Sequence, residues 1–409
     1  MALADVKIIK SNGGLGRRNP SSDGVSGFLT TGVAVPGKLV LGTVYKLQNM
    51  QDVQAIGIDE AYDTANNVLL FYSLAEIFRV NPDITLYLMV APQATTMADL
   101  LDPTKQYGPK LIAESEYSIV QLAVSFNPGG DYVPAPSGGL DGQVLAAVVQ
   151  AQLLATYSEG LHAPISSIGL EGKGFNGTTT AATDLRTLAS NKVSVIIGQD
   201  ASSAAAVSHP NHAAIGTWLG CVSKAVVNVN IGWPEQFPLT DGLKAKWLKA
   251  GLSGGTSISS YTGQQLNQLD DKGYIFARVI PQFAGVYLND SHTCTELADD
   301  YSRIEMNRTI DKAIKNIRAA LAAKLLSPLM VDEQTGLLDP ATVAVFETLA
   351  QSEVDAMKRA SEISGGTVYI NPEQNILANQ TLEVDVEIVP TGLAHTIKVK
   401  IGFNNPYKQ

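Results

Sequence analysis

The 409-residue chain has little charge, almost no cysteine and no long apolar run. Charged residues make up 17% of the chain, against roughly 25% in an ordinary soluble domain. The 39 acidic and 29 basic side chains give a net charge of −10, which argues against an electrostatic grip on nucleic acid or on an anionic membrane. No apolar run approaches the ~20 residues that span a bilayer, so no membrane insertion is expected. With so little charge, neutral polar groups or other protein must cover the surface.

Two cysteines, Cys221 and Cys294, are too few for a disulfide framework, so a reducing cytoplasm is the default compartment. Residues 1–5 lack a basic stretch followed by an apolar one, and no signal peptide is expected. The length predicts two or three domains, and the 36 glycines and 19 prolines imply many turns.

The first twenty residues look like a tether. Residues 5–10 are a short β-prone run, and residues 11–20 have the glycine-rich composition of a flexible spacer. A strand this short gains little stability unless it pairs with a sheet elsewhere.

Strands and helices alternate between residues 28 and 263. Strands are predicted at residues 28–35, 39–47, 84–91, 119–124, 165–170 and 193–198, and helices at residues 63–79, 140–157 and near 184–189. This order predicts a parallel sheet with helices on its faces, and a domain at about residues 117–263.

The last third of the chain changes character. A helix is predicted at residues 299–326, and a second helix begins at Asp339 and Pro340, an N-cap acceptor followed by proline at the first helical position. Residues 381–389 alternate strictly between apolar and acidic side chains, as in a half-buried strand. After a turn at residues 390–392, apolar residues alternate with lysines to finish the chain.

The two alternating segments carry opposite charges. Antiparallel pairing across the turn would set acids opposite lysines, each pair contributing roughly 0.2–1 kcal/mol and helping to fix the register. The acids are Glu383, Asp385 and Glu387, the lysines are Lys398 and Lys400, and the apolar residues of the second segment are Ile397, Val399, Ile401 and Phe403.

Two glycine-rich segments resemble catalytic loops. Residues 251–255 match Gly-x-Ser-x-Gly around Ser253, but a helix is predicted before them, at residues 243–249, and a loop after them, so a flexible linker is favoured. Residues 169–174 lack the spacer and the Ser or Thr after lysine that a phosphate loop needs, and a turn is favoured.

His209, His212 and Cys221 form the one potential metal cluster in the sequence. Two imidazoles three residues apart could share a zinc ion, but a site needs a third ligand in a defined geometry. Helix capping by Asn211 and packing of His212 and Cys221 are favoured. Nothing assembles into an active site, and neither a cofactor nor a metal is expected.

The layout resembles that of contractile tail sheath proteins, as found in contractile-tailed bacteriophages and phage-derived injection machines. The resemblance covers most of the chain. Among the known subgroups, the chain is similar to the shorter, two-domain sheaths. The Trp-Gly-Ala-Arg-Thr type of segment common in phage sheaths is absent, and Val-Tyr-Leu-Asn-Asp stands near that place at residues 286–290. The resemblance rests on residues 6–16, 24–36, 274–279, 299–359 and the closing section 382–401.

The resemblance implies a subunit of mixed α/β and α+β class with two domains and extended terminal β-arms. Residues 21–116 and 264–395 would form the core domain, with helices on a mixed sheet built from both chain ends. Residues 117–263 would form an inserted outer α/β domain. Residues 1–20 and 396–409 would be the N-terminal and C-terminal arms.

The arms of such subunits add strands to sheets of neighbouring subunits, which is β-augmentation. The residues implied for exchange are Val6, Lys7, Ile8 and Ile9 at one end and Ile397, Lys398, Val399, Lys400, Ile401 and Phe403 at the other, with Gly13, Gly14 and Gly16 in the flexible arm. Whether the last strand pairs within its own subunit or in a neighbour stays open.

The resemblance further implies a structural protein and not an enzyme. Copies would polymerise helically, in hexameric rings, around an inner tail tube, and would contract to drive the tube through a target cell envelope. Baseplate and tail terminator proteins would be further partners, and the protein would belong to a virion tail or contractile particle assembled in the bacterial cytoplasm. The residues leave open an α/β hydrolase or metal-dependent enzyme that uses the middle domain, while a tail tube or baseplate protein fits less well.

Overall fold

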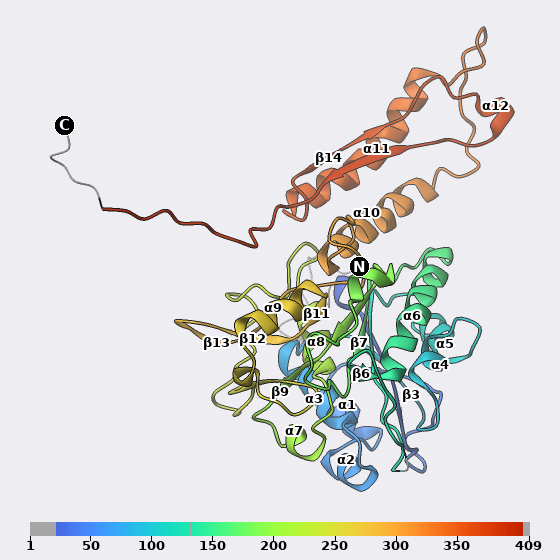
Figure 1. Cartoon of the computed structure of the whole chain (residues 1–409). Coiled ribbons are helices and arrows are strands. Elements are labelled where there is room, and N and C mark those ends of the chain that lie inside the picture. Colours follow the sequence, from blue (N-terminus) through green and yellow to red (C-terminus); the bar gives the residue numbers. More distant parts are fainter. Residues whose placement is uncertain (1–21, 131, 404–409) are drawn as a thin grey trace, which may run out of the picture. The chain divides into compact units, whose positions relative to one another are not determined.

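The computed structural model describes residues 22–130 and 132–403. It divides into two compact units, Met1–Lys315 (unit 1) and Asn316–Gln409 (unit 2), shown in Figure 1. In the described residues, no helix combines the length and the apolar character that crossing a membrane requires.

Unit 1 is built from short strands and from helices that connect them. Its strands are β1 (Ser26–Gly32), β2 (Val44–Leu47), β3 (Leu86–Pro92), β4 (Gln121–Val124), β5 (Pro136–Ser137), β6 (Leu140–Asp141), β7 (Ser167–Glu171), β8 (Val193–Ile196), β9 (Gly198–Asp200), β10 (Ala250–Leu252), β11 (Tyr274–Ile275), β12 (Ala277–Ile280) and β13 (Phe283–Leu288). Its helices are α1 (Met50–Ala55), α2 (Glu60–Asn66), α3 (Leu70–Val80), α4 (Met97–Leu101), α5 (Tyr107–Glu114), α6 (Gly142–Gly160), α7 (Ala204–Ser208), α8 (Ile215–Lys224) and α9 (Gly263–Asp271).

The remaining elements lie towards the end of the chain. Helix α10 (Ile304–Ala322) begins in unit 1, and unit 2 holds α11 (Pro340–Arg359), β14 (Gly365–Tyr369), α12 (Ile376–Asn379) and β15 (Asp385–Val389).

A seven-stranded sheet organises unit 1. Its order is β11-β8-β7-β4-β1-β3-β2, and every neighbouring pair is parallel except β2 with β3. All seven residues of β1 are buried, as expected for a central strand covered on both faces. The chain runs from β1 to β3 on one side and then returns to β4 on the other, so the strand order reverses between β1 and β4.

Helices cover both faces of this sheet (Figure 1). A Cβ added at Gly27 of β1 would meet Leu111 of α5, whereas one added at Gly32 would meet Leu70 of α3. Because alternate residues of a strand face opposite sides, α5 and α3 lie on opposite faces. The alternation of strands and helices predicted from the sequence is confirmed, and it gives the mixed α/β class.

Helices α3 and α8 cross at very close range. A Cβ at Gly216 of α8 would lie 2.2 Å from the carbonyl oxygen of Ser73, and one at Gly220 would lie 2.6 Å from Val80 Cβ. On the opposite side of α8, the buried Trp218 lies over Gly169 of β7, where a Cβ would come within 2.3 Å of the indole ring. Glycine therefore sets the spacing between α3, α8 and the sheet.

Two helix predictions are wrong because side chains bind nearby backbone. The helix predicted at residues 63–79 is two helices, since Asn67 is left-handed (φ 52°) and the Asp63 carboxylate accepts from Phe71 N and Tyr72 N at 2.9 and 3.0 Å. Residues 243–249 are a turn followed by a bend, not a helix, because the Asp241 carboxylate accepts from the backbone N–H groups of residues 243 and 244. These bonds are local alternatives to a helix.

The sheet takes strands from both sides of residue 117. Strands β1, β2 and β3 come from residues 21–116, and β4, β7 and β8 come from residues 117–263. The boundary between the two compact units lies in the sequence between Lys315 and Asn316. The boundaries expected at 117 and 263 stay a prediction.

A buried polar cluster surrounds the first turn of α10. Asn230 Nδ2 donates to Glu305 Oε1 at 3.0 Å, and Ser291 donates to the other carboxylate oxygen. Burial raises the pKa of Glu305 to about 7. Burial would also raise the pKa of Asp290, but the neighbouring His292 and Arg303 lower it to about 2.

Glu305 makes the stability of unit 1 depend on pH. Because its pKa rises from 4.5 in the unfolded chain to about 7 in the folded one, its contribution to stability falls as pH rises through that interval. Glu305→Gln should remove this loss. Between about pH 5 and about pH 8, the free energy of unfolding of this variant should therefore rise by roughly 2.5 kcal/mol relative to that of wild type. Urea unfolding followed by tryptophan fluorescence reports on unit 1, which contains Trp218, Trp233 and Trp247.

The control for this experiment is Glu296→Gln, which changes an exposed carboxylate. Its difference from wild type should be the same at both pH values. A pH-independent difference for Glu305→Gln as well would contradict the role assigned to Glu305.

The close crossing of α3 and α8 predicts that Gly216→Ala destabilises unit 1. The added methyl group overlaps backbone of α3, so the helices must separate, at a cost of about 1–3 kcal/mol. Gly160→Ala is the matched control, because a Cβ there has nothing within 4 Å. Equal unfolding free energies of the two variants, from the same fluorescence measurement, would refute the close contact.

Candidate assembly surface

Unit 2 has a small core under one long helix. The core consists of Leu338, Val343, Phe346 and Ile370. Asp339 caps α11 as predicted, accepting from Ala341 N at 2.8 Å, with Pro340 at the first helical position. Helix α11 packs against the two-stranded antiparallel sheet of β14 and β15 (Figure 1).

One edge of this sheet is covered by α11. Backbone groups of alternate residues point to opposite edges of a strand in an antiparallel pair. On β14, the Gly366 carbonyl accepts from Gln351 Nε2 at 3.2 Å and Val368 N donates to Gln351 Oε1 at 3.0 Å. Ile370 N donates to Glu347 Oε1 at 2.9 Å. The side of β14 that faces away from β15 is therefore closed by helix side chains.

The outer edge of β15 is open. Gly366 is paired with Ile388 and Val368 with Val386. Because the Gly366 carbonyl and the Val368 N–H point away from β15, the backbone groups of Val386 and Ile388 point away from β14. Within residues 22–130 and 132–403, β15 pairs with β14 alone. An edge of this kind is a template for another strand.

The exposed face of β15 is acidic. Val386 and Ile388 are half-buried, while Asp385 and Glu387 are exposed. Glu383, just before the strand, is exposed as well and presents a third carboxylate. The alternation predicted at residues 381–389 is thus confirmed over β15.

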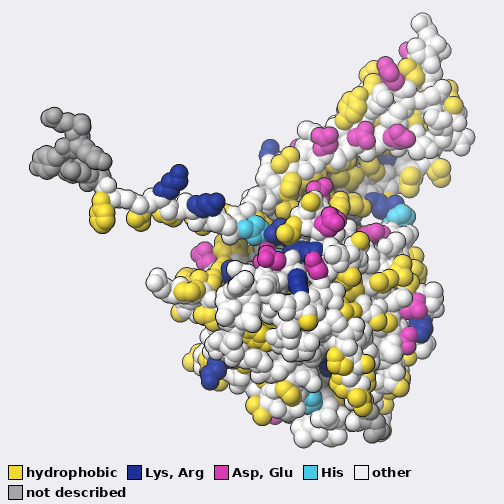
Figure 2. All heavy atoms as spheres, viewed as in Figure 1, with side chains coloured by type: hydrophobic (Ala, Val, Ile, Leu, Met, Phe, Trp, Pro, Cys, Tyr) yellow, Lys and Arg dark blue, Asp and Glu magenta, His cyan; other side chains and the backbone are white. Residues whose placement is uncertain are grey.

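The last described segment, residues 397–403, belongs to no helix or strand. Its apolar side chains are nearly fully exposed: Ile397 81%, Val399 74%, Ile401 94%, and Phe403 completely. Lys398 and Lys400 lie between them, and Figure 2 shows the apolar and basic side chains along the segment. In the described residues, this segment does not pair with residues 381–389 as the sequence allowed, and β14 is the strand that pairs with β15.

The sequence predicts an N-terminal arm at residues 1–20. Its candidate residues Val6, Lys7, Ile8, Ile9, Gly13, Gly14 and Gly16 lie outside the described residues.

The glycine-rich segments are parts of the fold. Ser253 follows β10 directly, but its side chain is fully buried and donates to the Gly172 carbonyl oxygen, and its backbone N–H donates to Ile197 O at 2.9 Å. Ser253 is therefore neither an exposed nucleophile nor part of a flexible linker. Residues 169–171 end the buried strand β7, so a turn can begin only after Glu171.

The three residues of the potential metal cluster do not form one site, because His209 and His212 line a pocket that Cys221 does not line. Cys221 is buried in the core, and burial raises the pKa of its thiol to about 12. In the described part of the chain, no three His, Cys, Asp or Glu side chains gather as a metal cluster. The capping role expected for Asn211 is wrong, because the residue before α8 is Ala214.

Comparisons with solved structures show which fold this is. A chain of the anti-feeding prophage (AFP) baseplate is 14% identical, with a TM-score of 0.61 and 99% of both chains covered. The AFP helical sheath in its contracted state gives 16% identity and a TM-score of 0.60, with 99% of this chain and 100% of that chain covered. The sheath of the extracellular contractile injection system PVC, also contracted, gives 12% and 0.58, with 99% and 98% covered.

These likenesses confirm the sheath-type fold predicted from the sequence. The comparison with curated proteins finds no match. The family model of the DUF2586 N-terminal domain matches residues 3–292, and that of the DUF2586 C-terminal domain matches residues 300–408. Because the two matches span almost the whole sequence, the chain belongs to the DUF2586 family.

Proposed function

We propose that this chain is the structural subunit of a contractile sheath, linked to its neighbours by its C-terminal segment. The observation that carries the proposal is that unit 2 has two surfaces without a partner in the described residues. They are the open edge of β15 and the exposed alternating segment 397–403. The sheath-type fold supports it.

The two surfaces match each other chemically. Segment 397–403 of one copy would add a strand to the open edge of β15 in the next copy, so that backbone groups on both strands gain partners. Lys398 and Lys400 would then lie on the same face as Asp385 and Glu387, where each cross-strand ion pair contributes roughly 0.2–1 kcal/mol. The apolar side chains would leave water, at a gain of about 1.5–3 kcal/mol for each one fully buried.

An arm that docks on a different surface of the next copy makes a head-to-tail contact. Such a contact produces a helical filament when its rotation does not close into a ring. Residues 6–9 of the N-terminal arm would supply a further exchanged strand. Hexameric rings stacked around an inner tube, with residues 117–263 facing outward, complete the proposed arrangement.

The role is mechanical and not catalytic. Subunits would move as rigid bodies from an extended lattice to a shorter, wider one, while the exchanged arms keep them connected. The free energy would be stored in the extended lattice, so that no nucleotide hydrolysis is needed. Besides copies of this chain, the partners would be the tube, baseplate and terminator proteins of a contractile particle assembled in the bacterial cytoplasm.

Removal of residues 396–409 should abolish polymerisation without unfolding the subunit. The described part of this segment is exposed, so its loss removes little packing within the chain. Negative-stain electron microscopy should show filaments for wild type and none for the deletion, while circular dichroism spectra agree. A deletion of residues 1–16 should behave in the same way. If either deletion variant still forms filaments like those of wild type, strand exchange by the deleted arm is refuted.

Charge reversal tests the pairing of the segment with β15. Lys398→Glu with Lys400→Glu places acids against acids and should block assembly, because like charges across strands repel. Adding Asp385→Lys and Glu387→Lys to the same chain restores opposite charges and should restore filaments. Lys358→Glu with Arg359→Glu, at the exposed end of α11, is the matched control and should assemble normally. Light scattering would follow all four proteins, and failure of the fourfold variant to regain assembly would contradict this register.

A further inference from the structure

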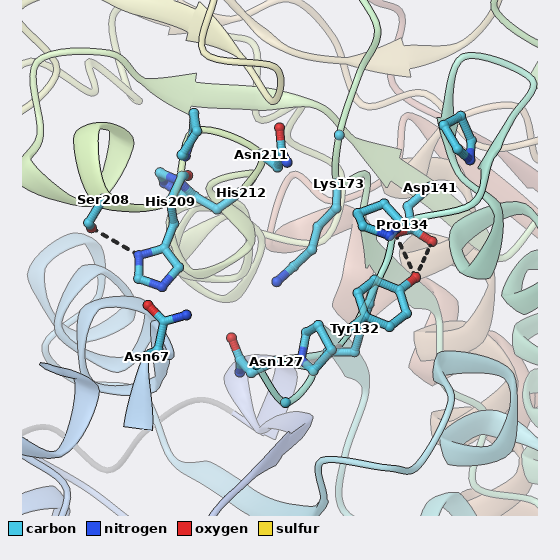
Figure 3. Close-up of a pocket in the computed structure, with 17 residues that line it drawn as sticks. Asn67, Asn127, Tyr132, Pro134, Asp141, Lys173, Ser208, His209, Asn211 and His212 are labelled. Atoms are coloured by element: carbon cyan, nitrogen blue, oxygen red, sulfur yellow. Dashed lines mark hydrogen bonds between the residues drawn. The ribbon is translucent and has the colours of Figure 1, made fainter. Parts of the chain in front are cut away.

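A pocket of about 420 Å³ opens in unit 1 beyond the carboxyl ends of β4 and β7. Its walls come from the segment after β4, the segment after β7, and the residues between α7 and α8 (Figure 3). Ligands of open α/β sheets bind at the carboxyl ends of strands where the strand order reverses, and β4 is one of the two strands at that reversal here. The volume suits a small molecule.

Lys173 brings a cation that is paired on one side only into this pocket. Figure 3 shows its side chain reaching into the middle of the space, between His209 and Tyr132. The side chain is only 15% exposed. Its ammonium group lies 3.5 Å from Glu171 Oε2 and 5.0 Å from the centre of the Phe126 ring. Because an ammonium group has three N–H donors, its pairing with one carboxylate leaves donors for a ligand. Buried donors of this kind are normally satisfied.

His212 supplies a buried acceptor at the same site. The side chain is 3% exposed, and its Nδ1 lies 2.7 Å from the carbonyl oxygen of His209. A carbonyl only accepts, so Nδ1 carries the proton and Nε2 presents a lone pair. The amide hydrogens of Gln199 are taken by the carbonyl oxygens of Pro210 and His212, at 2.9 Å each. In the described part of the chain, Nε2 has no hydrogen-bond partner.

The rest of the lining is nearly neutral and includes two aromatic rings. The rings of Phe126 and Tyr132 meet edge to face with their centres 5.7 Å apart. The Tyr132 hydroxyl donates to the Asp141 carboxylate at 2.7 Å, and Gln143 N donates to the same group at 3.0 Å. The charge of Glu171 offsets that of Lys173. An ion would gain little here, whereas a neutral ligand with several hydroxyl groups could use both the donor and the acceptor.

We propose that this pocket binds a single sugar residue or a similarly small, neutral, polyhydroxylated molecule. One hydroxyl accepts from Lys173 Nζ, another donates to His212 Nε2, and an apolar C–H face packs against Phe126 and Tyr132. The site is independent of the arm exchange proposed above, so filaments seen by electron microscopy neither support nor weaken it.

The test is saturation-transfer NMR on the full chain, with glucose, galactose, mannose and N-acetylglucosamine as probes at millimolar concentration. At least one neutral sugar should receive saturation, and Lys173→Met and His212→Phe should each weaken its binding about tenfold or more. Lys224→Met, at the exposed end of α8, is the control and should bind as wild type does. Comparing each sugar with its methyl glycoside separates free sugars from terminal residues of a glycan, and binding of either supports the site.

Three results would overturn the proposal. In the first, none of the sugars receives saturation. In the second, glucuronate or 3-phenylpropionate receives saturation and no neutral sugar does. In the third, a folded Lys173→Met protein binds the sugar as strongly as wild type does. Tryptophan fluorescence and circular dichroism establish which variants fold. Lys173→Met keeps the apolar part of the side chain and carries the test if His212→Phe does not fold.

Discussion

Backbone N–H and C=O groups have to be hydrogen-bonded, and this requirement governs unit 2. Helix α11 meets it on one side of the small sheet, where Gln351 and Glu347 bind the outer edge of β14. It leaves the outer edge of β15 without a strand in the described residues. A sheet of two strands over a small core is marginal by itself, and a third strand would add both hydrogen bonds and apolar cover. The proposed assembly follows from this one open strand edge.

Much of the fold could be predicted because its signals are local. The buried strand β3 is a continuous apolar run, and β15 alternates with a period of two. Asp339 followed by Pro340 marks the start of α11. Each of these patterns is contained in a few neighbouring residues, so no knowledge of the rest of the chain is needed to recognise it.

The missed elements depend on contacts that a sequence pattern does not contain. Strand β14 begins with two glycines and gives no alternation, yet it is the partner of β15. The break at Asn67 depends on the Asp63 carboxylate binding two N–H groups at the start of the next helix. The exposed segment could be recognised as a strand in search of a partner, but the open edge of β15 could not, because it depends on Gln351 closing the opposite edge. Likewise, only the fold brings Lys173 and His212 to one pocket.

The low charge of the chain and the acidic face of β15 bear on the same question of specificity. Little charge across the surface lets copies approach closely without strong repulsion, while a few placed charges decide which surfaces meet.

The acidic face also makes assembly directional. If the open edges of two β15 strands paired with each other, Asp385 and Glu387 of one copy would lie against the same carboxylates of the other, and like charges across strands are destabilising. The symmetric dimer, which would close the edge and end growth, is thereby disfavoured. What remains favourable is a chain of unlike contacts with two different ends, so that the polymer has a polarity from its first pair of subunits.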